Sequence, residues 1–413
     1  MRWQNDLSSV AMSPRSHDIA CLTSRFDTLI HEPLITLLND DADLLAAESC
    51  VRQLRKRSDV TMVIGTGGAS LGAQALLGVA EVKRSRTAHR VEFIDNIDPE
   101  TFSHAFSGRD LTRMSFLLIS KSGETVETLA AALSVITLYK EAGLLPDLSE
   151  RLVVITGPQD SSLRQLAIQY GFRLFTHPDI GGRYSVFTIV GLLPALLAGV
   201  DIPALKQGAT QWVVALKAAM EHAPYEHAVL RSACWLAHSR KAHPIHVIMP
   251  YADSLRAYTR WFQQLWAESL GKKHDGSTAF AAIGALDQHS QLQLFLDGPK
   301  DKNFTFLLPK RGQFGTKLST YGIEALDFMH GATMGDVMDA SAEATIATLR
   351  AHGATLRVLR TDTLDMFALG ELLMMHMVET VFVAALMGVN PYDQPAVEEG
   401  KTLTRHYLRL RSA

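Results

Sequence analysis

Short runs of strand-forming residues alternate along the chain with longer stretches that have a helical pattern. Alanine, leucine and charged residues fill the longer stretches, which suits helices that cross from one strand to the next. This alternation is typical of βαβ units, in which helices cover a parallel sheet. In the first half of the chain, strands are predicted at residues 60–64, 91–94, 116–120, 152–156 and 172–175.

A second alternation follows residue 200. Strands are expected at 246–249, 304–307 and 356–359, with helices around 254–270, 339–352 and 364–387. We therefore predict an α/β fold of two domains, each a parallel β-sheet flanked by helices. Residues 1–200 hold an N-terminal segment and the first domain, and residues 201–413 hold the second domain with the C-terminal helices. Two halves of such similar size could be a divergent duplication, which the sequence alone leaves open.

The composition is that of an ordinary globular protein of two or three domains, with 413 residues, 47% hydrophobic and 20% charged. The formal net charge of −3 gives no broad positive field, which argues against nucleic acid or a membrane surface as a partner. An anionic ligand must then be held locally, so we expect a small-molecule site. Cys21, Cys50 and Cys234 are widely spaced and odd in number, which favours a reduced, cytoplasmic location.

The most apolar stretch, residues 364–387, is interrupted by ionisable residues, namely Asp365, Glu371, His376 and Glu379. No charge-free run in the chain reaches the roughly 18 residues that a membrane span requires. We therefore expect a buried core helix here. The first residues of the chain also lack the continuous apolar core of a signal peptide.

Glycines gather in the turn after the first predicted strand, in the sequence VIGTGGASLGAQALLG at residues 63–78. Because glycine has no Cβ, backbone N–H groups there can approach a phosphate or a sugar oxygen. The turn matches neither the GxGxxG of dinucleotide-binding folds nor the GK[ST] ending of a P-loop. A purely structural tight turn is an equally good interpretation.

A second turn follows another predicted strand, in FLLISKSGETVETL at residues 116–129. Four hydroxyl groups surround its glycine at the start of a helix, where unpaired N–H groups and the helix dipole favour an anion. Helix capping is the alternative, but capping alone does not require four hydroxyls. We predict a phosphate cradle here, although Glu124 would repel a phosphate unless it turns to solvent or pairs with Lys121.

Six segments in the same order resemble the glucose-6-phosphate isomerase family. Residues 65–72 are similar to its GIGGSxLG motif and residues 120–128 to its SKSGTTxET motif. The others are GGRYS at 181–185, QQLWAESLGK at 263–272, DQHSQLQ at 287–293 and GVNPYDQPAVEEGK at 388–401. The resemblance covers about residues 62–401. It implies two domains of the sugar-isomerase (SIS) type and the interconversion of glucose 6-phosphate and fructose 6-phosphate through an enediolate, a step of glycolysis and gluconeogenesis.

Aldose–ketose isomerisation requires a base, a cation for the developing oxyanion and groups that open the sugar ring. The resemblance implies Glu268 as the base that moves the proton between C2 and C1, and Arg183 as the cation. It implies His289 and Lys401 as the groups that act on the ring. Without the resemblance, each has a plainer interpretation, such as an ion pair of Glu268 with Lys272 or a solvated side chain for Lys401.

The resemblance also implies a set of residues that contact the phosphate or the sugar, namely Gly67, Gly68, Ser70, Ser120, Lys121, Ser122, Thr125, Thr128 and Gln394. The chain departs from the family in two of these motifs, with Ala69 in place of a serine and Glu124 in place of a threonine. Both changes fall at substrate contacts. They keep open an isomerase of another sugar phosphate, such as mannose 6-phosphate.

No metal or cofactor is implied, since HxxEH and HExxH spacings are missing and Arg183 can hold the enediolate charge. The family's usual homodimer implies that His289 of one subunit completes the site of its partner. A non-catalytic phosphosugar sensor is the alternative from another class of protein. Such a sensor would not require the acid and base residues that this chain carries.

Overall fold

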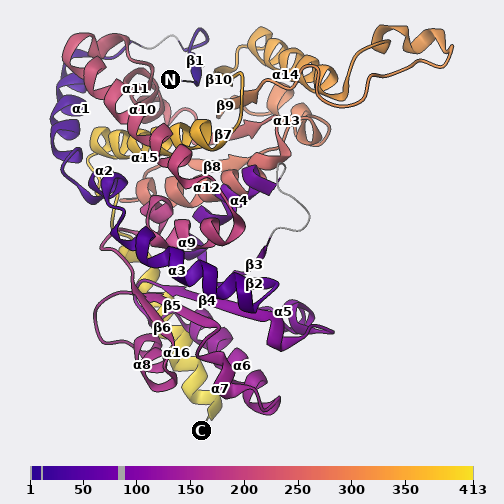
Figure 1. Cartoon of the computed structure of the whole chain (residues 1–413). Helices are drawn as coiled ribbons and strands as arrows, with labels where there is room; N and C mark the ends of the chain where they lie inside the picture. The colour runs from indigo at the N-terminus through magenta and orange to yellow at the C-terminus, as the bar shows by residue number, and fades with distance from the viewer. Residues whose placement is uncertain (1, 11–12, 82–88, 413) are drawn as a thin grey trace. The chain divides into compact units, whose positions relative to one another are not determined.

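The structure is a computed structural model that describes residues 2–10, 13–81 and 89–412. It divides the chain into two compact units (Figure 1). Unit 1 consists of Met1–Thr28 and Pro203–Pro391, and unit 2 consists of Leu29–Ile202 and Tyr392–Ala413. Each unit is built on one five-stranded sheet flanked by helices, which confirms the predicted α/β fold class.

The sheet of unit 2 is parallel throughout and has the order β3-β2-β4-β5-β6. Its strands are β2 (Val60–Ile64), β3 (Arg90–Ile94), β4 (Met114–Ser120), β5 (Leu152–Thr156) and β6 (Arg173–Thr176). Strands β2, β4 and β5 are buried along their whole length, which is why these apolar runs do not alternate with polar residues. Ile64 of β2 is paired with Leu118 of β4, so the turns after these strands leave the same edge of the sheet.

The helices of unit 2 surround this sheet. One face packs on a core that contains Met62, Phe116 and Tyr139, to which the helices between β3 and β6 contribute. The α-helices are α2 (Pro33–Thr36), α3 (Ala42–Arg57), α4 (Leu71–Glu81), α5 (Pro99–Phe106), α6 (Val126–Glu141), α7 (Leu145–Leu148), α8 (Ser162–Tyr170), α9 (Ile189–Ala198) and α16 (Glu398–Ser412). Short 3-10 helices are η1 (Leu37–Asn39), η2 (Gly67–Ala69), η3 (Leu111–Arg113), η4 (Gly182–Phe187) and η9 (Pro395–Val397).

The sheet of unit 1 has the order β1-β10-β9-β7-β8, with β1 antiparallel to β10 and the other pairs parallel. Its strands are β1 (Gln4–Asp6), β7 (Ile245–Pro250), β8 (Thr278–Ala281), β9 (Lys302–Pro309) and β10 (Thr355–Thr361). The α-helices are α1 (Ser16–Leu29), α10 (Ile202–His222), α11 (Ala228–Ser239), α12 (Arg256–Leu270), α13 (Leu292–Asp297), α14 (Met334–Ala351) and α15 (Met366–Met387). The 3-10 helices are η5 (Pro224–Glu226), η6 (Asp253–Leu255), η7 (Leu286–Gln288) and η8 (Glu324–Met329).

The two sheets repeat one strand order. In each, the second parallel strand (β3 or β8) forms one edge, and the first (β2 or β7), third (β4 or β9) and fourth (β5 or β10) follow it in that order. The edge strand beyond the fourth is parallel β6 in unit 2 and antiparallel β1 in unit 1. This shared order supports the divergent duplication that the sequence left open.

The eight predicted strands are all present, with ends that differ by a few residues at most. Two strands were not predicted. β1 has the sequence QND, which carries little strand preference, and β8 is the four-residue TAFA. Both lie at an edge of the sheet of unit 1, where pairing with a neighbour rather than local preference decides the conformation.

The two ends of the chain do not belong to the units in which the sequence analysis placed them. The break between Ile202 and Pro203 is close to the predicted boundary, but residues 1–28 belong with the second half and residues 392–413 with the first. At the N-terminus, β1 pairs with β10 and the indole of Trp3 donates to the Ala368 carbonyl at 2.7 Å. Such contacts join residues that are hundreds of positions apart, so no local pattern reveals them.

Helix α15 is the buried core helix expected at residues 364–387. It begins after Asp365, whose carboxylate accepts a hydrogen bond from the N–H of Ala368 at 2.9 Å, and it ends at Gly388 in the left-handed conformation. Among the described residues, it is the one helix whose length and composition suit a membrane span. However, 89% of its apolar window is buried within the protein.

Buried polar side chains meet in the core of unit 1. Arg357 on β10 donates to both carboxylate oxygens of Glu379 on α15, at 2.6 and 2.7 Å, and both side chains are fully buried. Arg357 also donates to the hydroxyl of Thr305, which bonds to the ring of His246 at 2.8 Å. Burial, with a smaller effect of the Arg357 charge, lowers the pKa of His246 to about 3.

Candidate functional site

The glycine turn after β2 is shaped by the segment that packs on it. A Cβ on Gly68 would lie 2.2 Å from the carbonyl carbon of Gly182, so only glycine allows this approach. Gly67 has a φ of +56°. Ser70 is fully buried, and its hydroxyl donates to the Gly67 carbonyl at 3.3 Å. The structure thus supports the packing interpretation of this turn, and it gives Ser70 an internal hydrogen bond.

The turn after β4 brings its hydroxyl groups together. The hydroxyls of Ser120 and Thr125 are 2.8 Å apart, and Ser120 Oγ also accepts from the N–H of Gly123 at 3.2 Å. Gly123 has a φ of +66°, and a Cβ there would lie 2.1 Å from Ser161 Oγ. Thr125 is the N-cap residue of α6, but its side chain makes no cap hydrogen bond. Thr128 is buried, with 1% of its surface exposed.

Lys121 and Ser122 occupy the exposed tip of the same turn. Lys121 Nζ contacts Asp179 Oδ1 at 2.9 Å, and the hydrogen bond from Lys121 lowers the pKa of the Asp179 carboxyl. The Ser122 hydroxyl accepts from the N–H of Glu124 at 3.1 Å. A cation and two hydroxyls, those of Ser122 and Thr125, therefore stand at the N-terminus of a 16-residue helix, α6.

Glu124 neither faces solvent alone nor pairs with Lys121, the two options that the sequence suggested. One carboxylate oxygen accepts from the N–H of Ser162, in the first turn of α8, at 2.6 Å. The other lies 3.3 Å from Arg405 Nη2, on the C-terminal helix α16. The carboxylate thus has two donors, and the charge of Arg405 offsets its repulsion of a phosphate bound at the turn.

Arg183 lies in η4, directly after the two glycines of the GGR motif, and only 2% of its surface is exposed. It donates to Gln394 Oε1 at 2.8 Å and to the Asp393 carbonyl at 3.0 Å. Tyr392 of the same segment donates its hydroxyl to Glu32. Gln394 therefore contacts the arginine directly.

A cavity of about 770 Å³ opens in unit 2 beside these residues. The turn after β4 supplies Lys121, Ser122 and Thr125, the GGR segment supplies Gly181 and Gly182, and the C-terminal segment supplies Gln394 and Lys401. Its full lining is Glu32, Pro33, Leu34, Lys121, Ser122, Thr125, Gln159, Asp179, Ile180, Gly181, Gly182, Tyr392, Gln394, Glu398 and Lys401. Lys401 is exposed, and its ammonium contacts Glu398 at 2.6 Å.

Among the lining residues that were missed from the sequence are Gln159 and Asp179. Gln159 comes three residues after the end of β5, and Asp179 three residues after the end of β6. In parallel α/β sheets, ligands bind at the carboxyl ends of the strands. That rule, applied to every predicted strand, would have pointed to both residues.

Glu268 lies in unit 1, near the end of α12, and is half-buried. Its carboxylate accepts a hydrogen bond from the side-chain amide of Gln264, one turn earlier, at 3.0 Å. Lys272, four residues after Glu268, donates to the Asn390 carbonyl. Gln264 is the first residue of the Q-x-x-x-E pattern, so its role in holding Glu268 could have been read from the motif.

His289 directly follows η7 in unit 1, and its side chain is exposed. The preceding residue, Gln288, anchors this segment because its amide oxygen accepts from the hydroxyls of Tyr251 and Thr345, at 2.9 and 3.1 Å. The QH pair thus combines a fixed glutamine with a histidine that is free to reach a ligand or another molecule.

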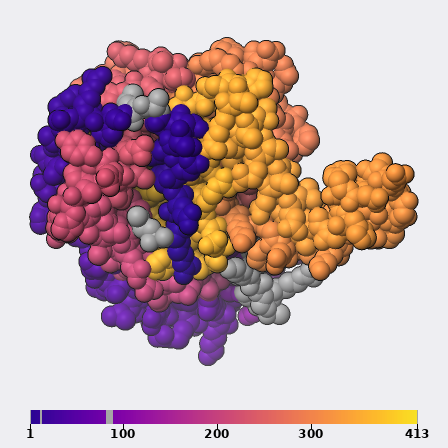
Figure 2. Space-filling view, turned by 90° about the horizontal axis from the view of Figure 1, so that it is seen from above, coloured from indigo at the N-terminus to yellow at the C-terminus, as the bar shows by residue number. Residues whose placement is uncertain are grey.

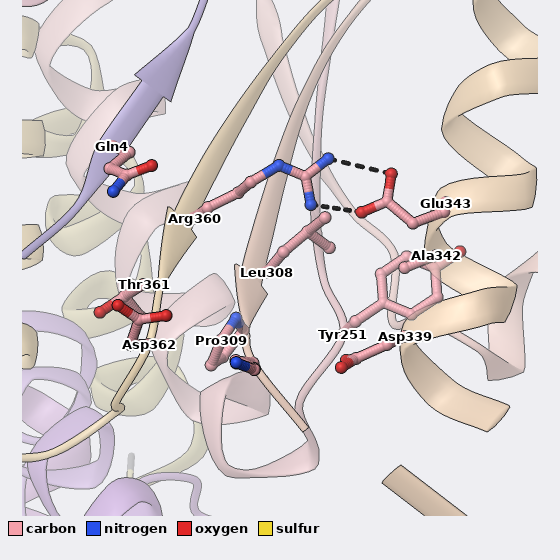
Figure 3. A pocket seen from close by; sticks show the side chains of 11 residues that line it. Gln4, Tyr251, Leu308, Pro309, Asp339, Ala342, Glu343, Arg360, Thr361 and Asp362 are labelled. Atoms are coloured by element: carbon pink, nitrogen blue, oxygen red, sulfur yellow. Dashed lines mark hydrogen bonds and ion pairs between the residues drawn. The ribbon is translucent and has the colours of Figure 1, made fainter. Parts of the chain in front are cut away.

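Unit 1 also has a pocket, of about 220 Å³, at the carboxyl ends of β9 and β10 (Figure 3). Arg360 and Glu343 face each other across it as an ion pair. Asp339 and Asp362 add two more carboxylates to its lining. The Asp339 carboxylate already accepts from the N–H groups of Arg311 and Gly312, so the larger cavity of unit 2 is the better candidate for a phosphate. Within the part of the chain that the structure describes, no three His, Cys, Asp or Glu side chains are grouped to hold a metal.

Comparisons with known proteins agree with the motifs. Residues 51–411 match the family model described as phosphoglucose isomerase. A glucose-6-phosphate isomerase of Thermus thermophilus is 35% identical over 90% of this chain and 89% of its own length. A crystal structure of the hypothetical protein TT0462 from the same organism superposes with a TM-score of 0.87, covering 98% of this chain and 99% of that one at 32% identity. A glucose-6-phosphate isomerase from Chlamydia trachomatis, at 22% identity, shares the fold with a TM-score of 0.77 over 95% and 78% of the two chains.

Proposed function

The chain belongs to the phosphoglucose isomerase family, and we propose that it catalyses the reversible conversion of glucose 6-phosphate to fructose 6-phosphate. The observation that carries this proposal is the cavity of unit 2, where a phosphate-type turn, the GGR segment and Lys401 come together. The three cysteines are all free thiols, which supports a cytoplasmic enzyme.

The turn after β4 holds the phosphate of the substrate. The first-turn N–H groups of α6 and the hydroxyls of Ser122 and Thr125 donate to its oxygens, and Lys121 supplies a positive charge. Asp179, which binds Lys121 in this structure, then shares the lysine with the phosphate. Ser120 and Gly123 hold the turn in shape, while Gly67 and Gly68 let the GGR segment approach it.

Glu268 moves the proton. Its carboxylate takes the proton from C2 of the open-chain aldose while the C1 carbonyl oxygen becomes the enediolate oxyanion. The same proton then returns to C1, and the C2 hydroxyl proton moves to O1, which gives the ketose. Arg183 supplies a permanent positive charge for the oxyanion. Gln264 fixes the carboxylate through its hydrogen bond, and His289 and Lys401 act on the ring oxygen and the C1 hydroxyl to open the sugar.

The enzyme works as a homodimer in which His289 completes the partner's site. The support is a segment between β9 and α14 that stands out from unit 1 as an orange lobe (Figures 1 and 2). It exposes aromatic side chains to an unusual degree, with Tyr321 90% and Phe328 83% exposed. Phe328 also lines an open groove that continues to Gln288, beside His289.

Sedimentation analysis tests the dimer. Phe328→Ser is expected to shift the protein toward monomer and to lower turnover with it, because the site then lacks the partner's histidine. Ile168→Ser, a change at another strongly exposed apolar residue, on α8, is the control and should leave both the dimer and the turnover unchanged. A monomer that is fully active would contradict the dimer proposal.

A coupled assay for the interconversion of the two hexose phosphates, with chelator present and no added metal, tests the reaction itself. Glu268→Gln is expected to lower kcat by roughly 10²–10⁴-fold, the usual effect of losing a general base. Binding of a hexitol 6-phosphate, which has the phosphate and hydroxyls but no carbonyl, should stay within about twofold. The exposed Glu221→Gln on α10 is the control. Binding without turnover in the unaltered protein would favour a sensor, and turnover of mannose 6-phosphate alone would favour another isomerase.

A further inference from the structure

Helix α16 has little apolar packing to hold it. Every residue from 398 to 411 is exposed, including Leu403 and Leu410. Figure 1 shows this yellow helix, the last of the chain, among the earlier elements of unit 2. A helix without a buried face is stabilised mainly by its few specific contacts. The polar contacts of α16 therefore decide where its side chains lie.

One of these contacts ties α16 to the phosphate turn. Arg405 Nη2 donates to the backbone carbonyl of Glu124 at 2.9 Å and lies 3.3 Å from the Glu124 carboxylate. The second carboxylate oxygen of Glu124 accepts from the N–H of Ser162 at 2.6 Å. Because α8 begins at Ser162, Glu124 is fixed on one side by α8 and can hold Arg405 on the other.

Lys401 lies one helical step of four residues before Arg405, so the two side chains share one face of α16. Lys401 lines the cavity with Ser122 and Thr125, and the Glu124 carbonyl that binds Arg405 lies between these two residues in sequence. A shift of Arg405 along the turn would therefore carry Lys401 away from the cavity.

We infer that Glu124 and Arg405 are positioning residues that hold Lys401 at the substrate cavity. The inference rests on the proposed function, in which Lys401 helps to open the sugar ring. It also explains why this chain carries a glutamate where the family motif has a threonine: the side chain at this place binds the C-terminal helix rather than the phosphate. Neither residue touches the reacting atoms.

Four variants measure the coupling between the two residues. Glu124→Gln keeps an oxygen for the Ser162 N–H but removes the charge, and we expect kcat/KM for the cyclic hexose phosphate to fall about threefold to tenfold. In Arg405→Gln, kcat/KM should fall further because the contact with the Glu124 carbonyl is also lost. The double variant should have the same kcat/KM as Arg405→Gln, since the two changes remove one interaction. Arg405→Lys should regain much of the loss, and Arg409→Gln, one turn farther along α16, is the control.

A substrate that cannot form a ring separates positioning from general damage. An aldotetrose 4-phosphate stays open, so its solvent deuterium exchange at C2 requires Glu268 but no ring opening. We expect that exchange to be unchanged in Glu124→Gln and Arg405→Gln, while turnover of the cyclic substrate falls. Equal losses with both substrates, or no loss with either, would overturn the inference.

Hydrogen exchange of the free protein tests the contact without any substrate. Amides of residues 398–412 should exchange faster in Glu124→Gln and Arg405→Gln than in the unaltered protein, and Arg409→Gln should leave them unchanged. Unchanged exchange in the first two variants would overturn the inference. Because this readout is independent of turnover, an inactive unaltered protein would count against the proposed function while the positioning contact would still be tested.

Discussion

At the carboxyl ends of their strands, the two sheets have turns with the same sequence pattern, but different side chains surround these turns. The third parallel strand of each sheet is followed by a lysine, a variable residue and a glycine: Lys121 to Gly123 after β4, and Lys310 to Gly312 after β9. In unit 2 this turn lines an open cavity of about 770 Å³. In unit 1 the Asp339 carboxylate accepts from the N–H of Arg311 at 3.1 Å and of Gly312 at 2.7 Å.

The fold therefore provides backbone N–H groups for an anion in both units. The neighbouring side chains decide whether those N–H groups can bind one. Asp339 comes from α14, which packs beside the turn, and it lines the small pocket of unit 1 (Figure 3). Its carboxylate occupies N–H groups of the kind that a phosphate would use. In unit 2 the carboxylate within the turn, that of Glu124, instead contacts the N–H of Ser162 and the guanidinium of Arg405.

The two glycines of these turns should differ most in their tolerance of a side chain. Gly123 has a positive φ, and its Cβ would meet Ser161 Oγ at 2.1 Å, whereas a Cβ on Gly312 would come no nearer than 3.1 Å to Asp336. We expect Gly123→Ala to lower the affinity for a hexitol 6-phosphate at least tenfold and the free energy of unfolding by about 1–3 kcal/mol.

Gly312→Ala is the matched control for this comparison. Its affinity for the hexitol phosphate should stay within about twofold, since the nearby carboxylate ends can shift. Calorimetric titration of the two variants measures the affinity for the hexitol phosphate, and chemical denaturation measures the free energy of unfolding. Equal effects of the two substitutions would mean that the turns do not differ in function.

Removing Asp339 should make the edge of unit 1 resemble that of unit 2. Asp339→Ala leaves the N–H groups of Arg311 and Gly312 without their acceptor, so the free energy of unfolding should fall by about 1–3 kcal/mol. Sulfate, an anion with the geometry of phosphate, should then raise the Tm of the variant more than that of the unaltered protein. An identical response to sulfate would show that these N–H groups do not form an anion site.

The interior of unit 1 should respond to acid. His246, on β7, has a pKa lowered to about 3 by burial. Its folded pKa lies below the unfolded value of about 6.5, so its neutral form stabilises the fold fully above pH 6.5, and this contribution is lost as pH falls toward 3. Between pH 6.5 and 5 the loss should approach about 2 kcal/mol, at about 1.4 kcal/mol per pH unit.

Denaturation of His246→Asn at several pH values checks this contribution. The variant is expected to lose less stability on acidification than the unaltered protein, whatever its stability at neutral pH. Unchanged pH dependence would show that another group carries the acid sensitivity of unit 1.

The sequence was informative where local pattern decides the structure. Buried parallel strands are nearly continuous apolar runs, so the strands at 60–64 and 152–156 could be predicted to the residue. The glycine turns and the hydroxyls around Gly123 follow from the same local rules. The family motifs added Arg183 and Gln394, which the structure places in contact at 2.8 Å.

Contacts between distant segments could not be predicted in this way. The pairing of β1 with β10, the return of residues 392–413 to unit 2 and the contact of Glu124 with Arg405 all join residues far apart in the chain. Asp339 looked like any other carboxylate of an amphipathic helix. Its role depends on the path of α14 past the turn after β9, which only tertiary packing determines.

The most direct test of this account is the number of phosphosugar molecules that one chain binds. Calorimetric titration of the unaltered protein with a hexitol 6-phosphate should give one site per chain. The affinity should fall about tenfold or more in Lys121→Met, because a charge-assisted contact to the phosphate is lost, and remain unchanged in Lys310→Met. Two sites per chain, or equal effects of the two lysine substitutions, would contradict the assignment of the substrate to the edge of unit 2.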